Sequence, residues 1–260
     1  MKSYANGNQK GGVGKTTITV FAAAAAVELG ARVLVGDLDP QGNATSTLDA
    51  QVSNYTVNDL LYPNPSGDVV EGAATAAICS AGPDWPTIDV LPATLGLADR
   101  EGDQVLGREY RLRTACHGCL DDYDLVLWDL PPSLGQLAVN GLTLTDEVRV
   151  IVEPKRYALD GAAQMMTTIQ RVQRYYNPGL AFSGLHVNRN RERTIEGRER
   201  LTELYELYPG AVLDPLLPYM EVLTKASGAC APLSAYGAES HAARDLFRSI
   251  AAGMLDGARA

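Results

Sequence analysis

Short apolar runs alternate with longer stretches of helical periodicity along this 260-residue chain. Runs rich in Val, Leu and Ile are typical of strands buried on both faces, and the stretches between them are long enough for crossover helices. This alternation predicts an α/β protein with a twisted, mostly parallel sheet flanked by helices. The chain has no internal repeat and no long linker, so we expect one domain over residues 1–260.

The predicted strands are the short apolar runs, and the predicted helices lie between them. The strands are expected at residues 32–36, 88–91, 125–129, 148–152, 180–187 and 211–217. The helices are expected at residues 15–29, 97–119, 158–176, 197–207 and 241–255. The helix at 97–119 contains three glycines, which are poor helix formers. Residues 41–87 are rich in Gly, Asn, Pro and Ser and are expected to form loops with short helices.

The first seven residues do not fit this scheme. The segment Met-Lys-Ser-Tyr-Ala-Asn-Gly is too polar to resemble a central buried strand. A phosphate-binding loop nevertheless normally follows an apolar strand. We therefore expect either a short strand here or an N-terminal segment with unusual packing.

The most informative motif is the segment Asn8–Thr17, with the sequence NQKGGVGKTT. Glycines at 11, 12 and 14 let the backbone fold tightly and turn its N–H groups toward phosphate oxygens. The helix predicted to follow adds the positive end of its dipole. This segment therefore predicts a phosphate-binding loop.

Two lysines and a threonine give this loop its chemistry. Lys15 is expected to reach the β- and γ-phosphates of a nucleotide, and the Thr16 hydroxyl is expected to coordinate Mg²⁺. The loop departs from the strict G-x-x-x-x-G-K-[ST] pattern, because Gln9 occupies the position of the first glycine. A second lysine, Lys10, begins the loop instead. This combination indicates a particular group of nucleotide switches.

Three aspartates end the predicted strands that neighbour this loop. Asp37 and Asp39 follow one strand, and Asp129 follows four apolar residues of another. Because parallel sheets bind ligands at the carboxyl ends of their strands, these residues should lie near the loop. Asp129 fits a Walker B acid that holds Mg²⁺ or its bound water, and Asp39 is placed to orient the attacking water or a Mg²⁺-bound water. The alternative for each is a helix cap or a turn.

Charge gives a mixed indication about partners. The net charge is −9 and the pI is about 4.8, which argues against tight binding of nucleic acid. Residues 149–200, however, contain ten basic and five acidic residues. This segment is either a basic zone that follows phosphates or a set of solvated helix faces. No apolar run reaches the roughly 18 residues that span a bilayer, and we expect a cytoplasmic protein without a signal peptide.

Cys116 and Cys119 have the spacing of a redox pair or of half a zinc site. The chain has no second C-x-x-C pair to complete a zinc site. Both cysteines fall in a stretch with helical character. We expect a structural role for them.

Three motifs in order resemble the ParA/Soj partition ATPases of the MinD/ParA group of deviant Walker A proteins. They are Asn8–Thr17, the segment DLDPQGNAT at residues 37–45 and the segment DLPPSLG at residues 129–135. The resemblance continues through residues 152–154 and 157–161 and covers most of the chain. It implies a single-domain P-loop NTPase that uses ATP and Mg²⁺.

The resemblance also implies a role for individual residues. Lys10 matches the signature lysine that crosses an ATP-sandwich dimer to the partner's nucleotide, which makes hydrolysis depend on dimerisation. The implied catalytic residues are Lys10, Lys15, Asp39 and Asp129, and the implied metal site is Thr16, Asp39 and Asp129. The implied nucleotide-binding residues are Lys10, Gly11, Gly12, Val13, Gly14, Lys15, Thr16, Thr17, Asn188 and Pro218. Asn188 lies where the family contacts adenine, although it also suits a turn.

In this family the ATP-bound homodimer binds DNA without sequence preference, and slow hydrolysis stimulated by a ParB-like protein releases it. Such a role in plasmid or chromosome partition would place the protein at the nucleoid. Arg189, Arg191 and Arg193 fall in one DNA contact zone of the family. The segment 217–225 is usually basic in the family, but here Lys225 is its only basic residue.

Other functions of the same nucleotide switch remain open. A MinD-like protein positions cargo on a membrane through a C-terminal amphipathic helix, but the apolar positions of residues 244–260 suit a helix that faces the core. We therefore expect no membrane partner, and the alternative to DNA partition is a ParA/MinD-like positioning ATPase that acts on a protein cargo or a membrane matrix. A reductase would need cluster-binding cysteines at a dimer seam, which Cys116 and Cys119 do not match. A regulatory protein that hardly hydrolyses ATP is disfavoured by the intact Lys10, Asp39 and Asp129.

Overall fold

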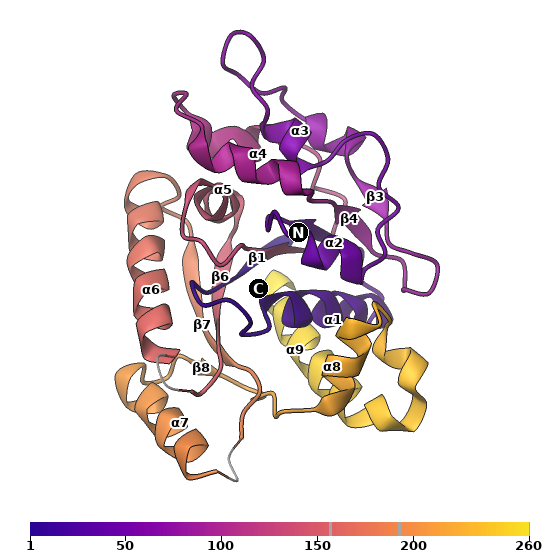
Figure 1. Ribbon diagram of the computed structural model, residues 1–260, viewed down its shortest axis with the longest axis vertical. Helices are drawn as coiled ribbons and strands as arrows, with labels where there is room; N and C mark the ends of the chain where they lie inside the picture. The colour runs from indigo at the N-terminus through magenta and orange to yellow at the C-terminus, as the bar shows by residue number, and fades with distance from the viewer. Residues whose placement is uncertain (156–157, 192–193, 260) are drawn as a thin grey trace.

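The computed structural model describes residues 1–155, 158–191 and 194–259. Within these residues the chain forms an eight-stranded sheet with helices on both faces (Figure 1). The strand order is β3-β4-β2-β5-β1-β6-β7-β8, and every neighbouring pair is parallel except β3 and β4. The strands are β1 (Lys2–Gly7), β2 (Val33–Asp37), β3 (Cys79–Ser80), β4 (Asp89–Leu91), β5 (Leu125–Asp129), β6 (Glu147–Val152), β7 (Ala181–Val187) and β8 (Val212–Leu213). The predicted α/β class is confirmed.

The helices bury their apolar faces against the two faces of the sheet. The α-helices are α1 (Lys15–Glu28), α2 (Asn43–Thr47), α3 (Val57–Leu61), α4 (Arg111–Ala115), α5 (Gln136–Leu144), α6 (Ala158–Tyr175), α7 (Ile195–Leu207), α8 (Glu221–Gly228) and α9 (His241–Arg259). The 3₁₀ helices are η1 (Ala73–Ala76), η2 (Leu95–Gly102), η3 (Arg108–Tyr110) and η4 (Leu233–Ser240). One hydrophobic core includes residues of α4, α5 and α6, and the other includes residues of α1, α8 and α9.

Most predicted elements are confirmed, but some of the helix predictions are wrong. The single helix predicted at 97–119 is instead η2, η3 and α4, and Gly107 adopts a left-handed conformation (φ 74°) directly before η3. The strand predicted at 211–217 is only two residues long, as β8. Helices α5 and α8 were not predicted, because Gly and Pro next to each obscured its short apolar pattern.

The polar N-terminal segment forms the central strand β1, between β5 and β6. Ser3 and Asn6 of this strand donate hydrogen bonds inside the protein. The backbone N–H and the hydroxyl of Ser3 both donate to Asp146 Oδ2 at 2.8 Å, and Asn6 Nδ2 donates to Thr19 Oγ1 at 2.9 Å. A strand of such composition is stable in the core because buried polar groups are tolerated when they are hydrogen-bonded.

His186 in β7 should make the fold sensitive to mild acid. The side chain is 0% exposed, and neither ring nitrogen has a hydrogen-bond partner within the described residues. Burial, together with the charge of Arg149, lowers the pKa of His186 to about 3. The unfolded chain takes up a proton at His186 near pH 6.5 and the folded chain does not, so His186 contributes a loss of stability as the pH falls below about 6.5.

We therefore expect His186→Leu to flatten the pH dependence of stability. Between pH 7.5 and pH 5.5, the variant should lose about 1 kcal/mol less free energy of unfolding than the unsubstituted protein, measured by urea unfolding. His241→Gln is the control, because His241 is exposed. This substitution should leave the pH dependence of stability unchanged. Equal losses for the His186→Leu variant and the unsubstituted protein would contradict this expectation.

Candidate functional site

The loop of residues 8–14 joins the end of β1 to the start of α1 at the carboxyl edge of the sheet (Figure 1). Gly12 and Gly14 adopt left-handed conformations, with φ angles of 76° and 92°. A Cβ at position 14 would overlap Asn188 Nδ2. Glycine is therefore required at position 14 both by the backbone angle and by the close approach of β7.

The start of the loop is fixed by Asn8. Its Nδ2 donates to the carbonyl oxygen of Ile151 at 2.6 Å, and its Oδ1 accepts from the N–H of Lys10 at 2.9 Å. Gly161 at the start of α6 leaves room for this side chain, because a Cβ there would lie 2.7 Å from Asn8 Oδ1. The loop is thus held against β6 and α6 where it begins.

The predicted metal-binding pair Thr16 and Asp129 is in direct contact. Thr16 Oγ1 donates to Asp129 Oδ2 at 2.6 Å. Asp129 is 1% exposed, and burial raises its pKa to about 7, helped by the charge of Asp37 and opposed by the Thr16 hydrogen bond and by Lys15. Lys15 is 7% exposed, and burial lowers its pKa, opposed by Asp129 and Asp39. The site therefore holds buried charges of both signs.

Asp37 and Asp39 differ in their surroundings although they are two residues apart. Asp37 Oδ2 accepts from the N–H and the hydroxyl of Thr45, both at 2.8 Å, and Oδ1 accepts from the N–H of Asp39 at 3.1 Å. Asp39 Oδ1 accepts from the N–H of Gln41 at 2.9 Å, and Asp39 lines a cleft of about 490 Å³ at this edge of the sheet. Asp37 therefore organises the segment after β2, while Asp39 faces the cleft.

A cleft of about 490 Å³ brings these elements together. A smaller hollow of about 90 Å³ adjoins it and shares Thr17, Arg189 and Ser227. The cleft is lined by Gly11, Gly12, Gly14, Lys15, Thr16, Thr17, Asp39, Gln41, Asn43, Thr47, Pro132, Arg189, Ser227 and Gly228. The hollow is lined by Thr17, Asn188, Arg189, Tyr219, Met220, Leu223, Thr224 and Ser227. Asn43 of α2 lies within the motif at residues 37–45, but the contributions of Thr47 and of α8 were not predicted, because they lie outside the motifs.

The residues after β7 contact the loop directly. Asn188 is 1% exposed; its Nδ2 donates to the carbonyl oxygen of Val13 at 2.8 Å, and its Oδ1 accepts from the N–H of Arg189 at 2.9 Å. Arg189 Nη1 donates to the carbonyl oxygen of Gly12 at 2.9 Å. Pro218 pairs with Asn190 in an isolated parallel β-bridge beside the smaller hollow.

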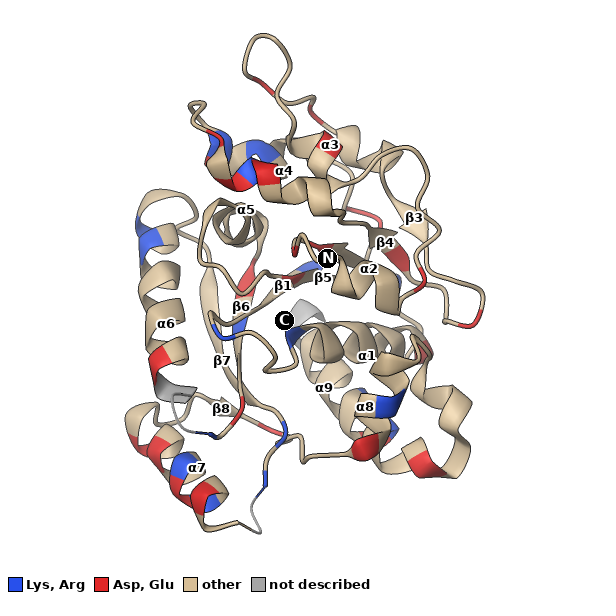
Figure 2. Cartoon of the chain, in the orientation of Figure 1, with Lys and Arg blue, Asp and Glu red and all other residues tan. Residues whose placement is uncertain are grey.

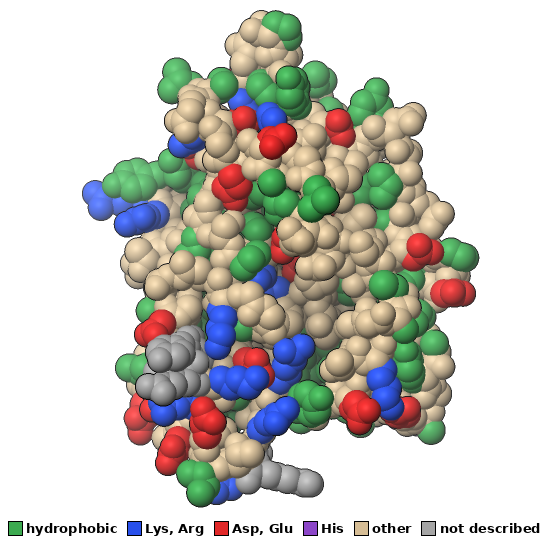
Figure 3. Space-filling view, in the orientation of Figure 1, with side chains coloured by type: hydrophobic (Ala, Val, Ile, Leu, Met, Phe, Trp, Pro, Cys, Tyr) green, Lys and Arg blue, Asp and Glu red, His purple; other side chains and the backbone are tan. Residues whose placement is uncertain are grey.

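Of the other residues predicted to contact DNA, Arg191 and Lys225 do not line the cleft, and Arg193 lies outside the described residues. The guanidinium carbon of Arg191 lies 4.5 Å from the ring centroid of Tyr219. Lys225 Nζ lies 2.9 Å from Glu239 Oε1 and 3.6 Å from Glu221 Oε1, which places two carboxylates at this lysine. Figure 2 shows Lys and Arg residues on the loops below β6 and β7, and Figure 3 shows such side chains gathered in the lower half of the same face, with Asp and Glu among them.

The remaining features lie away from the cleft. Cys119 Sγ donates to the carbonyl oxygen of Gly72 at 3.1 Å, and Cys116 is buried. The described residues contain no group of three His, Cys, Asp or Glu residues that could hold a metal ion. None of the described helices combines the length and apolarity needed to cross a bilayer.

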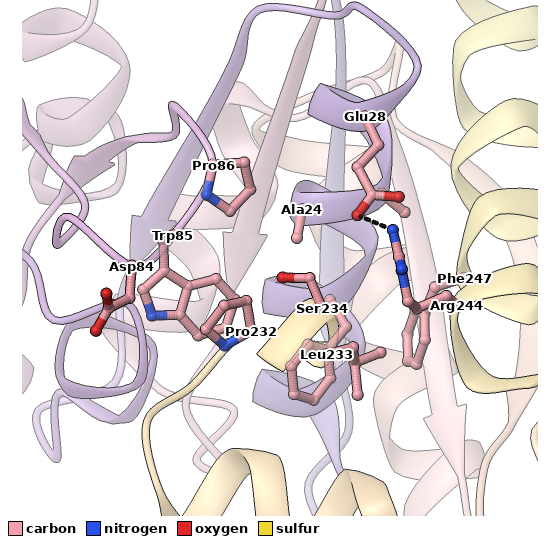
Figure 4. A pocket seen from close by; sticks show the side chains of 12 residues that line it. Ala24, Glu28, Asp84, Trp85, Pro86, Pro232, Leu233, Ser234, Arg244 and Phe247 are labelled. Atoms are coloured by element: carbon pink, nitrogen blue, oxygen red, sulfur yellow. Dashed lines mark hydrogen bonds and ion pairs between the residues drawn. The ribbon is translucent and has the colours of Figure 1, made fainter. Parts of the chain in front are cut away.

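A separate hollow of about 260 Å³ lies between α1, α9 and η4. Figure 4 shows Trp85 and Pro232 on one side of it and the ion pair of Glu28 and Arg244 on the other. Its apolar walls include Phe21 and Leu233. This hollow shares no lining residue with the cleft of about 490 Å³, and the residues of the phosphate loop line only that cleft among the two.

The chain is similar to a protein family, to several curated proteins and to solved structures. The family model AAA_31, described as an AAA domain, matches residues 1–182. The chain is 34% identical over 252 residues to the sporulation initiation inhibitor protein Soj of Bacillus subtilis (strain 168), covering 94% of this chain and 96% of that protein. It is 34% identical over 222 residues to the chromosome partitioning protein ParA of Caulobacter vibrioides, covering 84% and 80%.

A solved structure shows a similar arrangement. The structure titled cobyrinic acid a,c-diamide synthase, from Mycobacterium smegmatis with bound ADP and magnesium, aligns with a TM-score of 0.78 at 33% identity. The alignment covers 98% of this chain and 94% of that chain. A second structure of the same protein holds an ATP analog and magnesium.

Gly14→Ala tests whether the loop conformation is required for the fold around it. We expect a loss of about 2 kcal/mol in the free energy of unfolding of the ligand-free protein, because the left-handed conformation and the contact with Asn188 are both unfavourable for alanine. Gly11→Ala is the matched control, since a Cβ there meets nothing within 4 Å. Urea unfolding of the two variants measures the difference, and equal stability would mean that the loop adapts freely.

Proposed function

We propose a function for this chain from its membership of the ParA/Soj-type partition ATPases. It is a switch that dimerises when it binds ATP, and the ATP-bound dimer binds DNA without sequence preference. ATP hydrolysis releases the protein from DNA. The family membership makes it a ParA-like positioning ATPase. The dimerisation, the DNA binding and the stimulation of hydrolysis by a partner are the parts that we propose.

The residues around the cleft fit ATP and Mg²⁺, which are bound in related structures as an ATP analog with magnesium. The hydroxyl of Thr16 and the carboxylate of Asp129 are oxygen ligands of the kind that Mg²⁺ prefers. Thr16 Oγ1 and Asp129 Oδ2 lie 2.6 Å apart, so the two oxygens are adjacent to each other. When bound, the metal ion would supply positive charge to the phosphates. The loop N–H groups and Lys15 would bind the β- and γ-phosphates.

The observation that carries the proposal is the convergence of three motifs on one cleft. The phosphate loop and the segment after β2 line the cleft with Lys15 and Asp39. The end of β5 contributes Asp129, which accepts the hydrogen bond of Thr16 from the cleft wall. Asp39 is held through Gln41 N–H at the edge of the cleft, where it can orient the attacking water. Positioning and electrostatic stabilisation are the main requirements of phosphoryl transfer, and these residues supply both.

A homodimer accounts for the second lysine of the loop. Lys15 lines the cleft of its own chain, while Lys10 is half-buried at the other end of the loop. In an ATP-sandwich arrangement, Lys10 would reach the nucleotide of the partner subunit. An ammonium group in a closed interface stabilises the developing charge strongly, so hydrolysis would be slow until the dimer forms and a partner stimulates it. A ParB-like protein is the proposed stimulator.

The DNA part of the proposal rests on the basic zone at residues 149–200 and on the Lys and Arg side chains gathered on the face shown in Figure 3. Arg191 is exposed beside Tyr219, as a residue that contacts phosphates should be. Lys225 is already paired with Glu239 and is not needed for this role. A protein cargo is the second candidate. It is favoured by the pI of about 4.8 and by the ion pairs of Lys225 with Glu221 and Glu239.

Asp39→Ala tests the assignment of the catalytic acid. We expect ATP binding within about twofold of the unsubstituted protein, loss of hydrolysis by about 100-fold, and a dimer that persists with ATP. Isothermal titration, phosphate release and light scattering measure these quantities. Lys15→Ala is the contrasting variant and should abolish nucleotide binding. Full ATPase activity of Asp39→Ala would show that the catalytic assignment is wrong.

The DNA part of the proposal is tested by measuring how much DNA the protein retains with ATP, with ADP and without nucleotide, at several salt concentrations. We expect binding only with ATP, with log K falling by about 0.9 per phosphate contact for each unit of log salt. Arg191→Ala should weaken retention and lower this slope, whereas Lys225→Ala should change neither. ATP-driven dimerisation without any DNA retention at low salt would favour a protein cargo instead.

A further inference from the structure

We propose that Asn188 and Arg189 together hold the phosphate loop in its nucleotide-binding conformation, and that Arg189 is a positioning residue for ATP rather than a contact for DNA. The proposal rests on the proposed ATPase function for the identity of the ligand. Its structural basis is the pair of hydrogen bonds that these two residues make to the loop.

Two consecutive residues after β7 bind two consecutive carbonyl groups of the loop. Arg189 Nη1 donates to the oxygen of Gly12 at 2.9 Å, and Asn188 Nδ2 donates to the oxygen of Val13 at 2.8 Å. In a trans peptide the C=O and N–H groups point in opposite directions. Fixing these two carbonyls therefore turns the N–H groups of Val13 and Gly14 away from β7. Such N–H groups are the phosphate-binding groups of a loop of this kind.

The backbone at Arg189 is also unusual. Its φ angle is 53°, a left-handed conformation that costs roughly 1 kcal/mol for a residue with a side chain. The turn is held on both sides, because Asn188 N–H donates to the oxygen of Val152 and Asn190 N–H donates to the oxygen of Leu217, each at 2.8 Å. A strained conformation that its surroundings maintain in this way is typical of functional sites.

The position of Arg189 in the cleft supports the same role. Arg189 lines both the cleft of about 490 Å³ and the adjoining hollow of about 90 Å³. A guanidinium group has five N–H donors, one of which binds the loop. The guanidinium therefore lies at the edge of the cleft proposed to hold the nucleotide, where its charge can act on bound phosphates.

Arg191 provides a contrast only two residues away. Its guanidinium stacks on Tyr219 at 4.5 Å from the ring centroid, and the residue is exposed, whereas Arg189 is half-buried against Gly12. The left-handed turn at Arg189 separates the two environments. We therefore assign the two arginines to different ligands, and Arg191 serves as the matched control.

The first experiment measures the dissociation constants of MgATP and MgADP for the full chain. Arg189→Ala should weaken both by about tenfold, the effect of losing one hydrogen bond from a charged donor. Arg189→Lys keeps the charge and should recover part of the loss. Arg189→Gly relieves the backbone strain and should still bind as weakly as Arg189→Ala. Arg191→Ala should bind nucleotide normally.

Combining Arg189→Ala with Asn188→Ala should weaken binding by less than the product of the single effects, because both residues hold one loop. At saturating ATP, Arg189→Ala should retain DNA as the unsubstituted protein does, and Arg191→Ala should not. Normal nucleotide affinity of Arg189→Ala together with lost DNA retention would overturn the proposal and make Arg189 a DNA contact. Nucleotide affinities are compared only among variants with unchanged thermal stability.

A second measurement does not depend on ATP. Hydrogen exchange over residues 8–16 of the ligand-free protein should be faster in Arg189→Ala than in the unsubstituted protein and unchanged in Arg191→Ala. Failure of the unsubstituted protein to bind ATP would overturn the proposed function, and faster exchange in Arg189→Ala would still support the role of Arg189 in holding the loop. Identical exchange in all three proteins would overturn that role.

Discussion

Buried charge at the carboxyl edge of the central strands determines how the surrounding chain is arranged. Lys15, Asp37 and Asp129 are all buried there, and each would destabilise the fold by several kcal/mol without partners. Asp37 accepts hydrogen bonds from Thr45 and Asp39 and is committed to the structure. Asp129 is paired with the Thr16 hydroxyl and has a raised pKa. One carboxylate thus shapes the site while the other remains available to a cation.

The polarity of β1 follows from the same constraint. Asn6 lies in register with Asp129, and its amide donates to Thr19, which in turn donates to the carbonyl oxygen of Lys15 at 3.0 Å. The central strand therefore carries polar residues because it supports the first turn of α1 and the charged groups around it. An apolar strand at this position would leave Thr19 without the Asn6 amide.

The sequence predicted the phosphate loop, Asp39 and Asp129 because each belongs to a short contiguous motif. It could not predict the position of β1, since the partner of Ser3 is Asp146, far away in the chain. It could not distinguish the surroundings of Arg189 from those of Arg191, because a spacing of two residues does not reveal the left-handed conformation of Arg189. The helix expected at 97–119 was wrong because the left-handed Gly107 separates η2 from η3 and α4.

The turn after β7 joins the phosphate loop to the C-terminal part of the chain. Asn188 and Arg189 bind the loop, Asn190 pairs with the backbone of Leu217 and Tyr219, and Arg191 stacks on Tyr219. Packed side chains and hydrogen-bond networks can carry energetic coupling between sites, and this turn provides such a connection between the loop and the C-terminal part of the chain. A nucleotide that fills the cleft would therefore contact the turn that begins at Asn188. The same turn carries Arg191, which is exposed on the surface. Arg189, which contacts the phosphate loop, and Arg191, which is exposed on the surface, therefore follow each other on one turn, and under the proposed function a change at the nucleotide would reach the surface through this turn.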